Sequence, residues 1–132
     1  DAPAMARRIF ETQVKPDALI SSTARRALTT CGYFAEAFGI QKKDIQLQPM
    51  LYLPSVPVFY QVVQQLDDTL QTVFIFSHNN GITEFANSLT RTYVDNIPTC
   101  GVFAVAVNAA SWKRFADAPK QFLFFHYPKE LA

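Results

Sequence analysis

The sequence has little cysteine, and its two cysteines are not arranged for chemistry. Cys31 and Cys100 are separated by a spacing that fits neither a metal site nor a redox motif. We therefore expect free, buried thiols, as is usual in a reducing compartment, and a cytoplasmic protein. A disulfide would require the fold to bring the two residues together. Nothing in the sequence predicts a metal or any other cofactor.

Excess charge and long apolar runs are also missing. Lysine and arginine total 12 and aspartate and glutamate total 11, so the formal net charge is +1. Such a chain has no field that attracts nucleic acid or an anionic membrane, and any attraction to phosphate must be local. The apolar stretches are far shorter than the roughly 20 residues that cross a bilayer. We expect no nucleic acid and no membrane among the partners.

The sequence does contain enough apolar side chains for one core. Of the 132 residues 49% are hydrophobic, and no linker, repeat or low-complexity tract interrupts them, so residues 1–132 are predicted to form a single domain. Apolar runs alternate with helical patterns, which predicts an α/β fold with a mostly parallel sheet. We expect strands near 18–22, 45–48, 72–77, 102–107 and 121–126, and helices near 1–13, 23–38, 55–66 and 80–92. Gly39 is a plausible helix C-cap, and Trp112 with Phe115 should pack onto the sheet.

A histidine follows the most apolar run. Val73 to Phe76 reads as a strand covered on both faces, and it stops at Ser77-His78-Asn79-Asn80-Gly81. Open α/β sheets bind ligands beyond the carboxyl ends of their strands, which makes His78 a candidate site residue. The alternative is a structural histidine in an ordinary strand-to-helix turn, where Asn caps the helix and Gly takes a positive φ.

A second segment repeats this design. Asp17 to Ser22 is a short apolar run with a polar end, and Ser22 is placed to cap a helix that begins at Thr23. Arg25 and Arg26 then fall in the first turn, where the helix dipole disfavours cations and favours an anion. Arginine can bind two phosphate oxygens at once. The alternative, which we expect for one of the two arginines, is a surface ion pair.

Parallel strands end at the same edge of a sheet, so Arg26 and His78 should face one crevice. The stretches Ser21-Ser22-Thr23-Ala24-Arg25-Arg26-Ala27-Leu28-Thr29-Thr30 and Ser77-His78-Asn79-Asn80-Gly81 resemble the histidine phosphatase superfamily. Within it the chain is most similar to the small phosphohistidine phosphatases of the SixA type. Further matching pieces are Asp1 to Ala6, Leu51-Tyr52, Pro98-Thr99-Cys100 and Phe124 to Lys129.

The resemblance implies a fold, an activity and a site. The fold would be a three-layer α/β/α arrangement, phosphoglycerate mutase-like, with a mostly parallel central sheet and an antiparallel edge strand. The activity would be removal of phosphate from protein phosphohistidine through a covalent phosphohistidine on the enzyme. Arg26 and His78 would be catalytic, and Ser22 and Asn79 would bind phosphate. The partners would be a phosphorylated protein or a small phosphorylated substrate, and inorganic phosphate.

One diagnostic piece of the superfamily is not in the sequence. Its first strand ends in an Arg-His pair whose histidine is phosphorylated, and no Arg-His dipeptide occurs here. We expect an upstream strand and loop of about 30 residues, the size of a βα unit, to supply it. The alternative is a pseudo-phosphatase that has lost the nucleophile. Ser77 and Asn80 also replace the usual Gly and Pro, which should affect the rate more than the reaction.

The leaving group favours a phosphoramidate substrate. An ester leaves as an alkoxide and needs a positioned acid, but residues 50–55 contain no Asp or Glu. The imidazole of a phosphohistidine needs less help, and Tyr52 is more simply read as a packing residue than as an acid. A phosphatase of small esters and a non-catalytic phosphate-binding domain stay open as alternatives. His126, far from any motif, is read as structural.

Overall fold

The strands that end at the candidate site form a parallel sheet. The computed structural model describes residues 1–131 and places β1 (Ala18–Ser21) between β2 (Gln46–Leu47) and β3 (Val73–Phe76). Both neighbours run parallel to β1. Ser21 pairs with Phe76, so β1 and β3 end side by side. The predicted parallel arrangement of these two segments is confirmed.

The remaining strands form a separate antiparallel pair. β4 (Val102–Val107) pairs with β5 (Lys120–His126), with an irregularity between Ala104 and Val105. The predicted α/β class with parallel and antiparallel strands is confirmed. Within residues 1–131, however, the sheet is divided, because β4 is hydrogen-bonded to β5 and not to the parallel strands.

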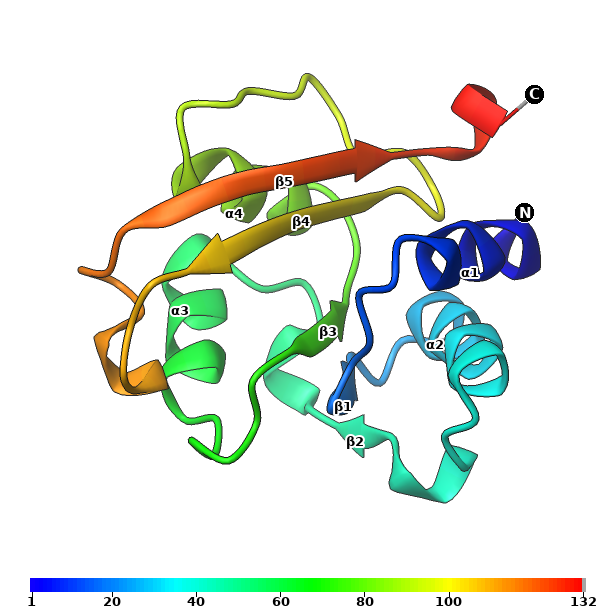
Figure 1. Ribbon diagram of the computed structural model, residues 1–132, viewed down its shortest axis with the longest axis horizontal. Helices are drawn as coiled ribbons and strands as arrows, with labels where there is room; N and C mark the ends of the chain where they lie inside the picture. The colour runs from blue at the N-terminus through cyan, green and yellow to red at the C-terminus, as the bar shows by residue number, and fades with distance from the viewer. Residues whose placement is uncertain (132) are drawn as a thin grey trace.

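Helices cover the parallel sheet on its two faces (Figure 1). α1 (Ala2–Glu11) packs against α2 (Arg25–Phe38), and α3 (Val56–Gln64) packs against α4 (Gly81–Leu89). Each helix has one apolar face, as amphipathic surface helices do. The two pairs lie on opposite sides of β3, which gives the layered arrangement that we expected.

Alternate side chains of β3 enter the two cores. Phe74 and Phe76 pack with Phe34 and with the buried residues of α1. Val73 and Ile75 pack on the other side, with the buried cluster of α3 and α4. This cluster comprises Ile20, Leu51, Phe59, Val62, Val63, Phe85 and Phe115. The period of two along the strand therefore fixes which core each side chain serves.

A cavity of about 590 Å³ lies between β3 and β4 and is lined by both strands along their whole length. We call it the β3–β4 slot. It explains why β3 is only half-buried although its sequence is entirely apolar: both faces are covered, as predicted, but one edge is open. An open edge presents unpaired backbone N–H and C=O groups that can pair with a further strand.

Helix α2 ends as predicted and begins later than predicted. Gly39 takes a φ of 68° at its C-terminus, the left-handed conformation of a glycine cap. We expected the helix to begin at Thr23, but it begins at Arg25, with Ala24 in the N-cap position and without a side-chain cap. The prediction that Ser22 is the N-cap is wrong.

The thiols and the single tryptophan behave largely as expected. Both cysteines are free; Cys31 is buried, and burial raises the pKa of its thiol to about 12. Cys100 was also expected to be buried but is partly exposed, in the loop before β4. Trp112 and Phe115 pack onto the α3–α4 core, and the indole N–H donates to the Leu70 carbonyl oxygen at 2.8 Å. None of the helices in residues 1–131 is long and apolar enough to span a bilayer.

Candidate functional site

The structure brings the two polar strand ends together. The Ser22 backbone N–H donates to the Phe76 carbonyl oxygen at 2.9 Å, which extends the pairing of β1 and β3 by one residue. The Ser22 Oγ then lies 3.5 Å from the Nε2 of His78, a long polar contact between residues 56 positions apart. Ser22 is fully buried and His78 is half-buried. The two segments therefore meet at one sheet edge through Ser22 and His78, and that Arg26 faces the same crevice as His78 stays a prediction.

The imidazole of His78 lies between a donor and an acceptor. Its Nε2 is 3.3 Å from the amide nitrogen of Leu53 and 3.2 Å from the carbonyl oxygen of Leu51. An unprotonated Nε2 accepts from the amide, whereas a protonated Nε2 donates to the carbonyl, so the two bonds are alternatives. The ring therefore keeps a protein partner in either state. An anion at this edge would compete with the Leu51 carbonyl for the Nε2 proton.

The loop at residues 51–53 holds His78 in place, a role that the sequence did not indicate. Leu51 is fully buried, and its carbonyl oxygen also accepts from the Ser77 hydroxyl at 2.8 Å. Leu53 has a φ of 49°, a left-handed conformation that costs a non-glycine residue roughly 1–2 kcal/mol. The same residue is 71% exposed, so no burial of its side chain offsets that strain.

Tyr52 stands beside the histidine. Its ring meets the His78 ring edge-on, with 5.6 Å between centroids and 80° between planes. The side chain is 56% exposed, so the packing contact that the sequence favoured is made at the surface, against His78, and not in the core. Its hydroxyl makes no hydrogen bond within residues 1–131.

Ser22 supports the site in a way that the sequence did not indicate. Its Oγ accepts from the Ala24 backbone N–H at 3.1 Å, which closes the turn between β1 and α2. The hydroxyl keeps its own proton free, so it can donate to the Nε2 of His78, 3.5 Å away, when that atom is unprotonated. The fully buried hydroxyl thus orients the ring, and direct contact of Ser22 with phosphate stays a prediction.

Arg25 and Arg26 occupy the first turn of α2, as predicted. Both side chains are exposed, and neither forms an ion pair within residues 1–131. The surface ion pair that we expected for one of them is not formed. The first turn also carries no acidic residue. Two guanidinium groups therefore lie without a carboxylate partner next to the positive end of a helix dipole.

Asn79 has a structural part that its sequence position did not reveal. Its Nδ2 donates to the Asn96 Oδ1 at 2.9 Å and to the Ile97 carbonyl oxygen at 2.8 Å, and its Oδ1 accepts from Thr83 Oγ1 at 2.6 Å. The side chain thus ties the turn after β3 to α4 and to the loop before β4. In the described residues the backbone N–H groups of Asn79 and Asn80 have no partner, and they are what this turn can offer an anion.

Gly81 is needed for close approach and not for a positive φ. Among the glycines only Gly39 has a positive φ. The expectation that a glycine at position 81 serves to take a positive φ is therefore wrong. A Cβ on Gly81 would lie 2.4 Å from the Pro54 carbonyl oxygen and 3.2 Å from Cε2 of Phe59. The missing side chain lets the turn that carries His78 pack directly onto the loop that holds His78.

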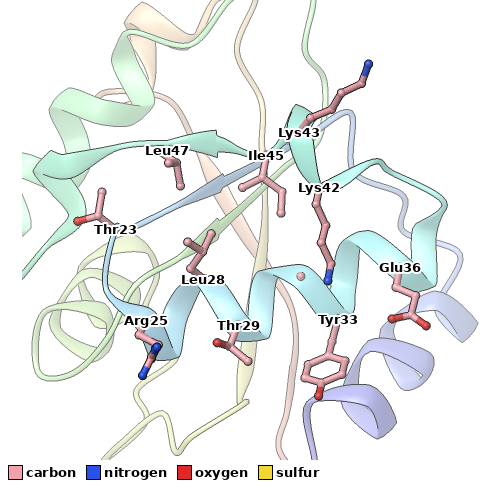
Figure 2. Close-up of a pocket in the computed structure, with 11 residues that line it drawn as sticks. Thr23, Arg25, Leu28, Thr29, Tyr33, Glu36, Lys42, Lys43, Ile45 and Leu47 are labelled. Atoms are coloured by element: carbon pink, nitrogen blue, oxygen red, sulfur yellow. The ribbon is translucent and has the colours of Figure 1, made fainter.

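A groove of about 800 Å³ begins next to this site and runs along α2 (Figure 2). Thr23 and Arg25 line its near end, and Lys42 and Tyr33 line it further along the helix. Neither His78 nor Ser22 lines it. We call it the α2 groove.

His126, the second histidine, lies away from these residues. It is in β5, where its Nδ1 contacts a carboxylate oxygen of Glu130 and its ring stacks on Phe124. This partnership fits the structural reading. No cluster of three or more His, Cys, Asp or Glu that suits a metal ion occurs in residues 1–131.

The comparisons with known proteins agree on the fold. No protein-family model and no curated protein matches the sequence. The solved structure of the protein histidine phosphatase SixA complexed with tungstate matches with a TM-score of 0.82 at 16% identity, covering 100% of this chain and 81% of that one. Proposed SixA phosphohistidine phosphatases from Nakamurella multipartitia and Agrobacterium tumefaciens match with TM-scores of 0.76 and 0.75. Their identities are 17% and 20%, and each match covers 96% of this chain and 79% and 78% of theirs. The chain therefore has the fold of the SixA phosphohistidine phosphatases, as its motifs indicated.

Proposed function

We propose that this protein is a phosphatase that removes the phosphoryl group from phosphohistidine in a cytoplasmic signalling protein. The observation that carries the proposal is the contact of Ser22 and His78 at the strand ends, next to the unpaired arginines of α2. This constellation occurs on a fold shared with a histidine phosphatase that binds tungstate. Tungstate, like phosphate, is a tetrahedral oxyanion, so a shared fold is expected to hold phosphate at the corresponding edge.

The residues at this edge are suited to a phosphoryl group. Arg26 would bind two of its oxygens through the guanidinium fork. His78 would donate from a protonated Nε2, exchanging the Leu51 carbonyl for a phosphate oxygen. The free backbone N–H groups of Asn79 and Asn80 would bind a further oxygen. Donors fixed in this way stabilise the charge of the transferring group, and Ser22 and Leu53 keep the His78 ring oriented.

The proposed reaction would use a nucleophilic histidine other than the two in these 132 residues. The sequence has two histidines; His78 is assigned to phosphate binding and His126 is paired with Glu130. The β3–β4 slot could receive a further strand that carries a third histidine. A strand inserted there would bond to the open edges of β3 and β4 and join the two sheets. If that strand ran parallel to β3, its carboxyl end would lie beside Ser77 and His78. A histidine at that end would face the phosphate site.

The reaction would then proceed in two steps. A ring nitrogen of the nucleophilic histidine attacks phosphorus, the new N–P bond forms, and the N–P bond to the substrate histidine breaks. The departing imidazole nitrogen takes up a proton. Water next attacks the phosphoenzyme, releases inorganic phosphate and restores the free histidine. The absence of Asp or Glu from residues 50–55, beside His78, favours this leaving group over an alkoxide.

One observation favours a second candidate. No Arg-His dipeptide occurs in the sequence, so the same site without a nucleophile would bind phosphate and never transfer it. Such a protein would be a phosphate-binding domain. A phosphatase of small phosphate esters is the remaining alternative, and it would turn over aryl or sugar phosphates rapidly.

Phosphate release from a phosphohistidine peptide and a phosphoserine peptide tests the proposal. The protein expressed from its natural reading frame should hydrolyse the first and leave the second. Arg26→Ala and His78→Ala should each lower the rate at least a hundredfold, in the range of a lost transition-state donor. Arg114→Ala is the matched control, because the segment around Trp112 contacts Leu70, at the opposite end of β3 from His78. Rapid hydrolysis of phosphoserine would refute the proposal, and binding of phosphate without turnover would establish the second candidate.

A further inference from the structure

An apolar rim adjoins the candidate site. Eight large apolar side chains are notably exposed in the described residues, and four of them lie within residues 47–53. These four, which we call the rim, are Leu47, Met50, Tyr52 and Leu53, with exposures of 56%, 40%, 56% and 71%. Exposed apolar residues scattered singly are ordinary on protein surfaces, whereas several gathered in one short segment beside a candidate site indicate an interaction surface. The rim adjoins the site directly, because the Leu53 backbone N–H donates to the Nε2 of His78 and the Tyr52 ring lies against the His78 ring.

The rim continues into the α2 groove through Leu47, which belongs to both. The floor of the groove is apolar, with Leu28 of α2 facing Leu47 and Ile45 in Figure 2. Thr23 lies at the near end, one residue after Ser22. Rim and groove therefore form a single surface that passes the candidate phosphate site.

The groove is basic. Arg25, Lys42 and Lys43 line it, against a single carboxylate from Glu36. The Lys42 side chain reaches down onto α2, whereas Lys43 extends away from the helix (Figure 2). The Lys42 Cε would lie 3.6 Å from a Cβ on Gly32, so the absent side chain leaves room for the lysine stem on the helix. No carboxylate within residues 1–131 pairs with any of the three cations.

We propose that the rim and the α2 groove together dock an acidic segment of the phosphorylated protein, with the rim covering apolar residues next to the phosphohistidine. The proposal rests on the proposed function and names its substrate class: a folded protein or long peptide with carboxylates on one side of the phosphohistidine. A small phosphate ester at His78 would meet the rim only at Tyr52 and Leu53 and would not extend along the groove to Lys42. Charge complementarity selects the acidic partner, and the continuity of the surface with the site places its phosphoryl group at His78.

Two phosphohistidine peptides of equal length test this, one with glutamates beside the phosphohistidine and one with glutamines at the same positions. The wild-type protein should show a KM about three- to tenfold lower for the acidic peptide, with an unchanged kcat, and salt should remove the difference. Lys42→Glu/Lys43→Glu should abolish the preference or reverse it. Lys113→Glu/Arg114→Glu changes the net charge by the same amount on another surface and should keep it. Hydrolysis of phosphoramidate should be equal in all three proteins.

The possible results distinguish a failure of the docking surface from a failure of the proposed phosphatase activity. Equal KM values for the two peptides in the wild type would overturn the docking surface and leave the phosphatase intact. Equal effects of the two double variants would overturn it as well, since only net charge would then matter. If no compound is hydrolysed, the proposed function fails. Fluorescence anisotropy with the same two peptides, without phosphate, then tests the docking surface separately. The surface is supported if the acidic peptide binds the wild type but not Lys42→Glu/Lys43→Glu, and the glutamine peptide binds neither. Any other result overturns it.

Discussion

Replacing Gly81 by alanine should damage both the stability and the site. A Cβ at this position would lie 2.4 Å from the Pro54 carbonyl oxygen, a distance that real Cβ atoms essentially never show, so backbone has to move. Phe59 behind it, at 3.2 Å, is fully buried and has little room to yield. Overpacking of this kind costs about 1–3 kcal/mol of unfolding free energy. The displaced segments are the ones that hold His78, so affinity for an oxyanion should fall as well.

Gly32→Ala provides the matched control. Gly32 lies inside α2, and its added Cβ would meet only the Lys42 Cε, at 3.6 Å, an ordinary contact. Alanine in a helix interior is favoured over glycine by up to about 1 kcal/mol, so this variant should be more stable than the wild type. Urea unfolding measures both free energies, and tungstate titration by calorimetry measures the site. A Gly81→Ala protein as stable as the wild type, with unchanged tungstate affinity, would refute the account of how the two loops pack.

Three other substitutions or probes test the remaining parts. Asp17 accepts from the backbone N–H groups of Thr72 and Gln71, which lowers the pKa of its carboxyl below 3.8. The carboxyl has a lower pKa in the folded than in the unfolded protein, so its ionised form stabilises the fold. Asp17→Asn should therefore lower the unfolding free energy at pH 7 by roughly 0.5–1 kcal/mol, a small value because solvent screens the exposed carboxylate. In acid unfolding curves this difference should vanish as the pH falls through the pKa of the folded state. Burial raises the thiol pKa of Cys31 to about 12, so Cys31 should react with a thiol reagent only after denaturation, whereas Cys100 should react in the native protein. Rapid reaction of both thiols in the native protein would contradict the fold around α2. Arg26→Ala should weaken tungstate binding about tenfold or more, and Arg26→Lys should recover only part of it, because lysine lacks the bidentate fork; unchanged affinity would remove Arg26 from the site.

The sequence predicted that the two polar segments of the candidate site meet at one sheet edge, because two local patterns point the same way. The apolar segments before Ser22 and His78 are short and end in polar residues, and only a parallel pairing brings those ends together. The same reasoning located every α-helix and strand of residues 1–131 to within a few residues. Boundaries failed where a turn competed with a helix, as at Ser22, whose hydroxyl closes the turn and leaves α2 to begin at Arg25.

Other features depend on contacts that no local pattern encodes. The support of His78 by Leu51 and Leu53 joins residues more than 20 positions apart, and the strain at Leu53 has no sequence signature of glycine or asparagine. The role of Gly81 follows from its closeness to Pro54, which only the folded chain reveals. The division of the sheet at the β3–β4 slot was likewise invisible, because an apolar strand reads the same with one paired edge or two.

The most direct test of the proposed mechanism is to trap the phosphoenzyme. The protein expressed from its natural reading frame should be mixed briefly with phosphoramidate, denatured in alkali and weighed intact by mass spectrometry. We expect one added phosphoryl group on a histidine other than His78 and His126, and a slower gain in His78→Ala. A protein that turns over phosphohistidine without ever gaining a phosphoryl group, or that carries it on His78, would contradict the assignment of His78 as a phosphate-binding donor beside a separate nucleophile.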